Sequence, residues 1–174
     1  MRSCLVLSDL PVTYRVNNFT NGAIAAIEDG WLGIKQTLER TVKLVNSFGI
    51  DRGNLTSSIA LIPLAYFIHR HPDHSFLGSS KYEVRNAQLM RRWLVLALLN
   101  GVFGRATEQV LVNTRRTIKS TLVDADFPYD ALNQELSRLN YSVALDDSTI
   151  QRFLTTTYPH TFLPLSIITA QGCA

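Results

Sequence analysis

The 174-residue sequence predicts an all-α fold, a single bundle of six to seven helices around a buried central helix at about residues 81–100. Two observations support this fold class. Apolar residues recur at steps of three and four along most of the chain, which is the period of an α-helix that buries one face. The stretch from Leu89 to Leu99 is apolar on nearly every side, which is typical of a helix enclosed by others.

The bulk composition fits one ordinary globular domain. The chain is long enough to bury a core, and 46% of its residues are apolar while 18% are charged. The slightly low charged fraction indicates surface covered by a partner or by the rest of a longer chain. The net charge of +3 is a mild basic bias, compatible with nucleic-acid binding but not typical of it.

Compartment is predicted from the apolar runs and the two cysteines. No apolar run approaches the roughly 18–20 residues that cross a bilayer, so we expect no membrane span and a cytoplasmic protein. Cys4 and Cys173 lie at opposite ends of the chain. Free thiols in a reducing compartment are expected, with a bridge between the termini as the alternative.

Residues 1–20 are predicted to form a poorly defined N-terminal arm ahead of a helical domain at residues 21–174. The segments CLVL and VTYRV could be short strands or extended arms, and Pro11 prevents a helix between them. A chain that opens in this way is expected to be a fragment of a larger multidomain protein.

A long amphipathic helix is predicted from Thr20, which can cap it, to Gly49. Gly30 and Gly33 each weaken it by about 1 kcal/mol relative to Ala, so a bend is expected there. Its apolar face is spaced by threes and fours and consists of Ile24, Ile27, Trp31, Ile34, Leu38, Val42, Val45 and Phe48.

The remaining helices follow from caps and breakers. A buried helix runs through IALIPLAYFIH, with Pro63 either as a kink or in its first turn. The central helix opens at Ser80 with Glu83 three residues on and closes at Gly101. Further helices are expected over residues 106–122, 128–139, about 146–154 and 160–170. The predicted structural core residues are Trp31, Leu89, Trp93, Leu96 and Phe103.

One histidine cluster has the look of a metal site: His69, His71 and His74 in the segment HRHPDH. Zinc sites on helices use histidines four residues apart and need three or four ligands in fixed geometry. Here Pro72 interrupts the helix, and the spacing matches none of the usual patterns. The alternative is that these side chains lie at the negative end of a helix dipole.

Exposed cations could contact phosphates, because arginine binds them in a bidentate manner. The alternative is a solvated face with internal ion pairs to Glu83, Glu108 or Asp124. The candidate nucleic-acid-binding residues are Arg91, Arg92, Arg105, Arg115, Arg116 and Lys119.

Motifs of catalysis are missing from the sequence. There is no GxSxG elbow, P-loop, GxGxxG or HExxH motif, so we predict no catalytic residue and no cofactor.

Four segments in order resemble one family: NLTSSIALIPLAYFIHRHP, MRRWLVLALLNGVFGRATEQVLVNTRRTIK, Phe127-Pro128 and YPHTFLPLSII. They resemble the helical region of a bacterial family whose N-terminal domain has a ParB/sulfiredoxin-like nuclease or NTPase fold, and which includes GmrSD-type modification-dependent restriction enzymes. The resemblance covers roughly residues 22–168. The family's DGQQR-type motif does not occur here, so the resemblance carries over no catalytic residue.

The resemblance implies a non-catalytic helical module of a phage-defence protein. Its partners would be a ParB-like nuclease or NTPase domain, or an HNH-type nuclease domain, of the same system, and it would help to position DNA. A second hypothesis is a free-standing protein-interaction or oligomerisation domain that forms homo-oligomers through the face from Ile24 to Phe48. A third is a small metal-dependent enzyme that uses the histidine cluster.

Overall fold

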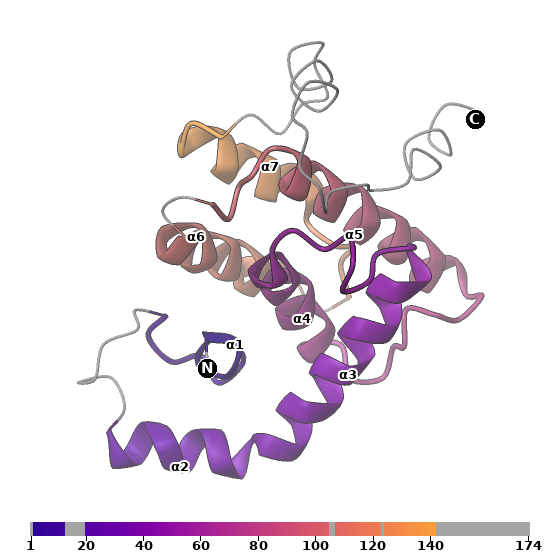
Figure 1. Cartoon of the computed structure of the whole chain (residues 1–174). Helices are drawn as coiled ribbons and strands as arrows, with labels where there is room; N and C mark the ends of the chain where they lie inside the picture. Colours follow the sequence, from indigo (N-terminus) through magenta and orange to yellow (C-terminus); the bar gives the residue numbers. More distant parts are fainter. Residues whose placement is uncertain (1, 13–19, 105–106, 123, 142–174) are drawn as a thin grey trace, which may run out of the picture.

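The computed structural model describes residues 2–12, 20–104, 107–122 and 124–141, and these form a bundle of packed helices (Figure 1). The described residues contain seven α-helices and one 3₁₀ turn and no strand, which confirms the all-α bundle. The helices predicted at about 146–154 and 160–170 lie outside the described residues. The elements are α1 (Arg2–Leu7), α2 (Asn21–Asp29), α3 (Trp31–Ser47), η2 (Ser58–Ala60), α4 (Leu61–His69), α5 (Lys81–Leu99), α6 (Thr107–Ser120) and α7 (Tyr129–Arg138).

The N-terminal segment is a helix and part of the core, so the prediction of a strand or extended arm at CLVL is wrong. Leu5, Val6 and Leu7 of α1 are buried, and α1 packs against α4. A four-residue apolar run does not by itself distinguish a strand from one buried helical turn. Contact with α4 decides in favour of the helix. Val12 is also buried, while the rest of VTYRV lies outside the described residues.

The predicted bend in the long helix occurs at Gly30, where α2 ends and α3 begins. Gly30 keeps a right-handed helical conformation, with φ −85° and ψ −2°, so the two helices follow one another without a loop. They meet at an angle, and α2 runs along the lower edge of the view in Figure 1. Only Ala23 of the nine residues of α2 is buried.

The buried face of α3 differs from the predicted one. Trp31, predicted to be a core residue, is 52% exposed, and Val42 is 48% exposed. The face against the core instead contains two threonines, because their hydroxyls find partners: Thr41 Oγ1 donates to the Thr37 carbonyl at 2.8 Å, and Thr37 Oγ1 lies 2.9 Å from His69 Nδ1. The buried residues of α3 are Ile34, Thr37, Thr41, Leu44 and Val45.

Two helices form the centre of the bundle. The helix α5 is buried continuously from Trp93 to Leu98, as expected of the predicted central helix. The helix against which α1, α3 and α6 all pack is α4, buried from Ile62 to Ile68. Pro63 lies in the first turn of α4, where its missing N–H has no intrahelical partner to lose. Of the other predicted core residues, Trp93, Leu96 and Phe103 are buried and Leu89 is half-buried.

Candidate binding surface

In the predicted metal cluster, His69 contacts α3, while the rings of His71 and His74 both lie near Phe76 and Tyr82. His69 Nδ1 contacts Thr37, and burial lowers the pKa of His69, with Asp9 opposing and Arg40 adding to this shift. His71 is buried, donates from Nδ1 to the Phe67 carbonyl at 2.7 Å and stacks on the Phe67 ring.

His74 lies with its ring 4.8 Å from that of Tyr82. Within the described residues, no group of three or more His, Cys, Asp or Glu could hold a metal ion. The arrangement therefore gives no support to a metal-dependent enzyme.

The three predicted cations of α6 all have partners within the fold. Arg115 donates to the Leu10 carbonyl at 2.5 Å, and Lys119 donates to Asp9 at 2.8 Å. Arg116 donates to Asn113 at 3.0 Å and pairs with Glu135 of α7 at 3.5 Å.

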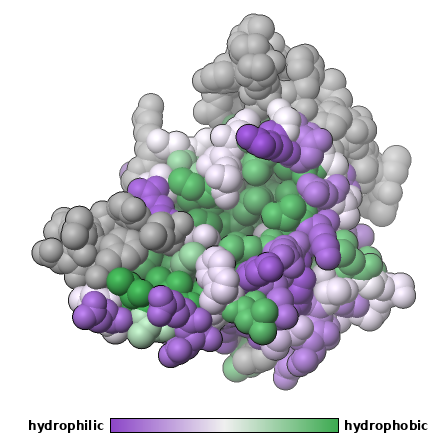
Figure 2. Space-filling view, turned by 60° about the horizontal axis from the view of Figure 1, so that its bottom comes forward, coloured by the Kyte–Doolittle hydropathy of each residue, from purple (hydrophilic) through white to green (hydrophobic). Residues whose placement is uncertain are grey.

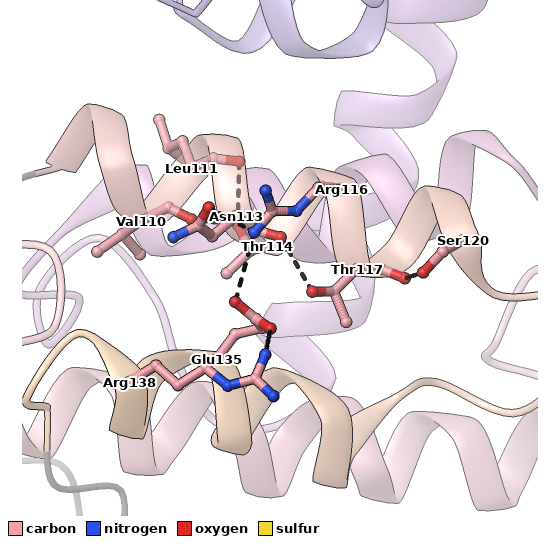
Figure 3. A network of polar contacts seen from close by, with 9 residues as sticks. All are labelled: Val110, Leu111, Asn113, Thr114, Arg116, Thr117, Ser120, Glu135 and Arg138. Atoms are coloured by element: carbon pink, nitrogen blue, oxygen red, sulfur yellow. Dashed lines mark hydrogen bonds and ion pairs between the residues drawn. The ribbon is translucent and has the colours of Figure 1, made fainter.

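Figure 3 shows that Arg116 and Arg138 both reach Glu135, which joins α6 to α7. These cations tie α6 to the N-terminal segment and to α7. Their acidic partners are Asp9 and Glu135 rather than the three carboxylates named from the sequence.

The two predicted cations of α5 have different surroundings. The guanidinium of Arg92 is exposed and lies 5.0 Å from the centre of the Tyr129 ring, in a cation–π contact. Arg91 is half-buried, and its Nε has no hydrogen-bond partner. Arg105 lies outside the described residues. A nucleic-acid-binding role for these six residues stays a prediction.

Asp9 is an important polar residue that the sequence did not reveal. Its carboxylate accepts a hydrogen bond from the Tyr66 hydroxyl at 2.8 Å as well as from Lys119. Burial raises the pKa of Tyr66, and the hydrogen bond to Asp9 raises it further. Asp9 therefore connects the N-terminal segment to α4 and α6. Its two partners are 57 and 110 residues away in the sequence, so no local motif could have indicated them.

Two further arginines bind main-chain carbonyls at the ends of helices. Arg40 donates to the His71 carbonyl at 3.0 Å and to that of His74. Arg70 donates to the Thr121 carbonyl at 3.2 Å and to that of Ile118. Arg40 therefore joins α3 to the loop that follows α4, and Arg70 joins the end of α4 to the end of α6.

One open hollow of about 350 Å³ lies between α3 and the loop that follows α4. Its lining contains both acidic and basic side chains, with Glu39 and Lys43 from α3 and Asp73 from the loop. Arg40, which also lines it, already donates to two carbonyls. Ser75, which also lines it, donates its hydroxyl to Glu83.

The most distinctive surface feature is an apolar stripe along α2 and α3. The residues are spaced so that they lie along one side of the two helices, next to the buried face. Ile24 is 43% exposed, Trp31 52% and Val42 48%, while Ile27 and Leu38 are half-buried. We name this set the α2–α3 stripe: Ile24, Ile27, Trp31, Leu38 and Val42.

Figure 2 looks at the underside of the molecule, where α2 and α3 lie. Apolar side chains gather across this face and charged side chains border them. The sequence predicted these five residues to be buried inside the bundle. Within this chain Ile24, Trp31 and Val42 remain exposed, whereas Ile27 and Leu38 are partly buried against the core.

No helix among the described residues is both long and apolar enough to cross a membrane. In comparisons with known proteins, the sequence matches no family model and no curated protein.

Proposed function

We propose that this chain is a non-catalytic helical module that binds another protein surface through the α2–α3 stripe. The observation that carries the proposal is the exposure of Ile24, Trp31 and Val42 along one side of α2 and α3. Transfer of a large apolar side chain from water into a packed interface stabilises a complex by roughly 1.5–3 kcal/mol. Tryptophan is also the residue most enriched among those that dominate binding energy.

The charged side chains support the same reading. Asp9, Glu135, Arg40, Arg70 and Arg115 hold segments of the fold together. Side chains with such structural partners are poorly placed to do chemistry on a substrate. The family resemblance offers one candidate for the bound surface, a ParB-like nuclease or NTPase domain or an HNH-type nuclease domain.

The two tryptophans allow a direct test. Trp31 is 52% exposed while Trp93 is 1% exposed, so a change in the fluorescence of the folded protein on binding reports mainly on Trp31. Addition of a purified ParB/sulfiredoxin-like domain from a GmrSD-type enzyme is expected to shift the emission to shorter wavelength and to protect Trp31 from acrylamide quenching.

The matched controls use two apolar surface residues. Trp31→Ala is expected to weaken binding in calorimetry, while Leu122→Ala, at an 80% exposed leucine outside the stripe, should leave it unchanged. Equal binding by both variants would exclude the stripe as the contact surface.

A second candidate function is DNA contact, favoured by the exposed guanidinium of Arg92 on α5. Loss of one phosphate contact lowers the slope of log K against log salt by about 0.9. Arg92→Ala is therefore expected to reduce both the affinity for duplex DNA and its salt dependence, while Arg52→Ala, at an exposed turn residue, serves as the control. Absence of binding to duplex DNA at low salt would end the DNA role and leave the protein-binding role standing.

A further inference from the structure

We infer that the surface bound by the α2–α3 stripe is the same stripe of a second copy of this chain, arranged antiparallel about a two-fold axis beside Trp31. This inference rests on the proposed function and names its partner. In a two-fold interface each residue meets its counterpart across the axis, so a self-pairing surface must be complementary to its own reversed copy. Ile24, Trp31 and Leu38 of the stripe meet this condition, and so do the net charges of α2 and α3.

Two apolar residues of the stripe are spaced symmetrically about Trp31. Ile24 precedes it by seven residues, across the break at Gly30, and Leu38 follows it by seven residues, nearly two full turns of α3. An axis beside Trp31 therefore brings Ile24 of one copy opposite Leu38 of the other. The two Trp31 side chains meet at the centre, where buried aromatic residues contribute most to binding.

The charges on the stripe are complementary in the same arrangement. Glu28 lies between Ile24 and Trp31, and Lys35 lies between Trp31 and Leu38 or Val42 along the same side of the helices. Both side chains are exposed. The axis that pairs Ile24 with Leu38 also brings Glu28 of one copy within one residue of the position opposite Lys35 of the other, twice in the dimer. A parallel arrangement would instead bring Glu28 against Glu28 and Lys35 against Lys35.

The complementarity extends to the whole of the two helices. The helix α2 has two acidic residues and no basic residue, so its net charge is −2. The helix α3 has three basic residues and one acidic residue, so its net charge is +2. Antiparallel pairing places α2 of each copy against α3 of the other, and opposite potentials across an interface fix its orientation. This separation of charge is the reason for choosing a second copy over a different protein.

The experiment is sedimentation velocity of the full chain over a wide range of concentration. The wild-type protein is expected to form a dimer as concentration rises. Trp31→Asp should weaken dimerisation by about tenfold or more, because it places a carboxylate at the centre of the interface. Leu122→Asp places a carboxylate on an exposed apolar position outside the stripe and should leave dimerisation unchanged. Far-UV circular dichroism checks that each variant is folded, and Trp31→Ala provides a second variant if the aspartate perturbs α3.

Charge reversal tests the arrangement. Glu28→Lys and Lys35→Glu should each weaken dimerisation, because each creates two like-charged contacts across the axis. A mixture of the two variants should form a heterodimer, and the variant carrying both changes should dimerise again. Arg52→Glu, at an exposed residue of the turn after α3, is the matched charge-reversal control.

The outcomes separate this inference from the proposed function. A wild-type chain that stays monomeric at all concentrations overturns the second copy as partner, and binding of another protein is still judged by Trp31 fluorescence. If the Trp31→Asp variant dimerises as strongly as the wild type, the contact lies elsewhere on the molecule and the inference is overturned. Dimerisation that depends on Trp31 but not on the charge reversals overturns the antiparallel arrangement while supporting the stripe as a binding surface.

Discussion

At the residue scale, the carboxylate of Glu83 organises the loop before α5. It accepts hydrogen bonds from the Ser75 N–H at 2.8 Å and from the Phe76 N–H at 3.0 Å, and also from the hydroxyls of Ser75 and Ser80. The sequence predicted a capping box between Ser80 and Glu83, and Ser80 Oγ does accept from the Glu83 N–H. The carboxylate itself reaches further back than a capping box requires, to a loop eight residues away.

Gly78 is required beside this carboxylate. A Cβ at Gly78 would lie 2.2 Å from Glu83 Oε2, so Gly78→Ala should displace the Glu83 side chain and break its hydrogen bonds to the loop. We expect a loss of about 0.5–1.5 kcal/mol in the free energy of unfolding, measured by urea denaturation. Gly22→Ala is the control, because the nearest atom would be 3.9 Å away and alanine favours the helix. A Gly78→Ala protein as stable as Gly22→Ala would contradict this account.

The lowered pKa of Asp9 predicts how the stability of the protein depends on pH. Burial raises its pKa, but hydrogen bonds from Lys119 and Tyr66 outweigh this and hold the pKa below the ordinary 3.8. A carboxyl whose pKa is lower in the folded state stabilises the protein above its unfolded pKa, and this stability is lost as pH falls through the folded pKa. Asp9→Asn should therefore lower stability by about 1 kcal/mol at pH 7, with less difference from the wild type below about pH 4.

The Asp9 measurement is the urea midpoint at neutral and acidic pH. Asp29→Asn, at an exposed carboxylate at the end of α2, is the control and should have little effect at either pH. A constant difference between Asp9→Asn and wild type across this range would mean that the charge of Asp9 does not contribute.

At the element scale, α3 shows why a correct helix can be given the wrong buried face. The sequence favoured Trp31 and Val42 over Thr37 and Thr41 because it ranks side chains by hydropathy. Thr37 contacts His69 of α4, and Thr41 donates to the Thr37 carbonyl of its own helix, so both hydroxyls are hydrogen-bonded where they are buried. Trp31 and Val42 lie outside. Polar groups are buried at modest cost when they are hydrogen-bonded.

The orientation of α3 is tested by two truncations on the same helix. Ile34 is 1% exposed and Val42 is 48% exposed. Ile34→Ala should lower the free energy of unfolding by about 2–4 kcal/mol, while Val42→Ala should cost less than about 1 kcal/mol. Urea denaturation at low protein concentration separates this effect from association. Similar losses for both variants would mean that the predicted face, rather than the observed one, is buried.

At the scale of the whole molecule, the N-terminal segment belongs to the core rather than to an arm. Its buried apolar residues pack against α4. Its polar contacts join Asp9 to Tyr66 and Lys119, the Leu10 carbonyl to Arg115, and Arg2 to Glu108. Two of the six cations that were candidates for DNA contact, Arg115 and Lys119, thus hold the N-terminal segment on the fold.

Deletion of residues 1–12 should therefore remove cooperative unfolding. It exposes the surface of α4 that Leu5, Val6 and Leu7 cover, and each such side chain contributes roughly 1.5–3 kcal/mol of burial. Thermal unfolding followed by circular dichroism should show a broad or strongly lowered transition. Deletion of residues 1–3 alone, which keeps these three side chains, should retain a sharp one. If the protein that lacks residues 1–12 unfolds sharply at an unchanged temperature, the N-terminal segment is an arm outside the core, as the sequence predicted.

The sequence by itself determined the fold class and the limits of several helices. The cap at Ser80, the end of α5 at Gly101 with φ of +59°, and the break at Gly30 were all readable, because each depends on groups within about four residues along the chain. Tertiary structure alone decided that α1 is a helix, that α1, α3 and α6 pack on α4, and which side of α3 is buried. It also decided which carboxylates and carbonyls the cations of α6 bind. These outcomes depend on contacts such as that of Arg115 with Leu10, 105 residues apart, which no local pattern encodes.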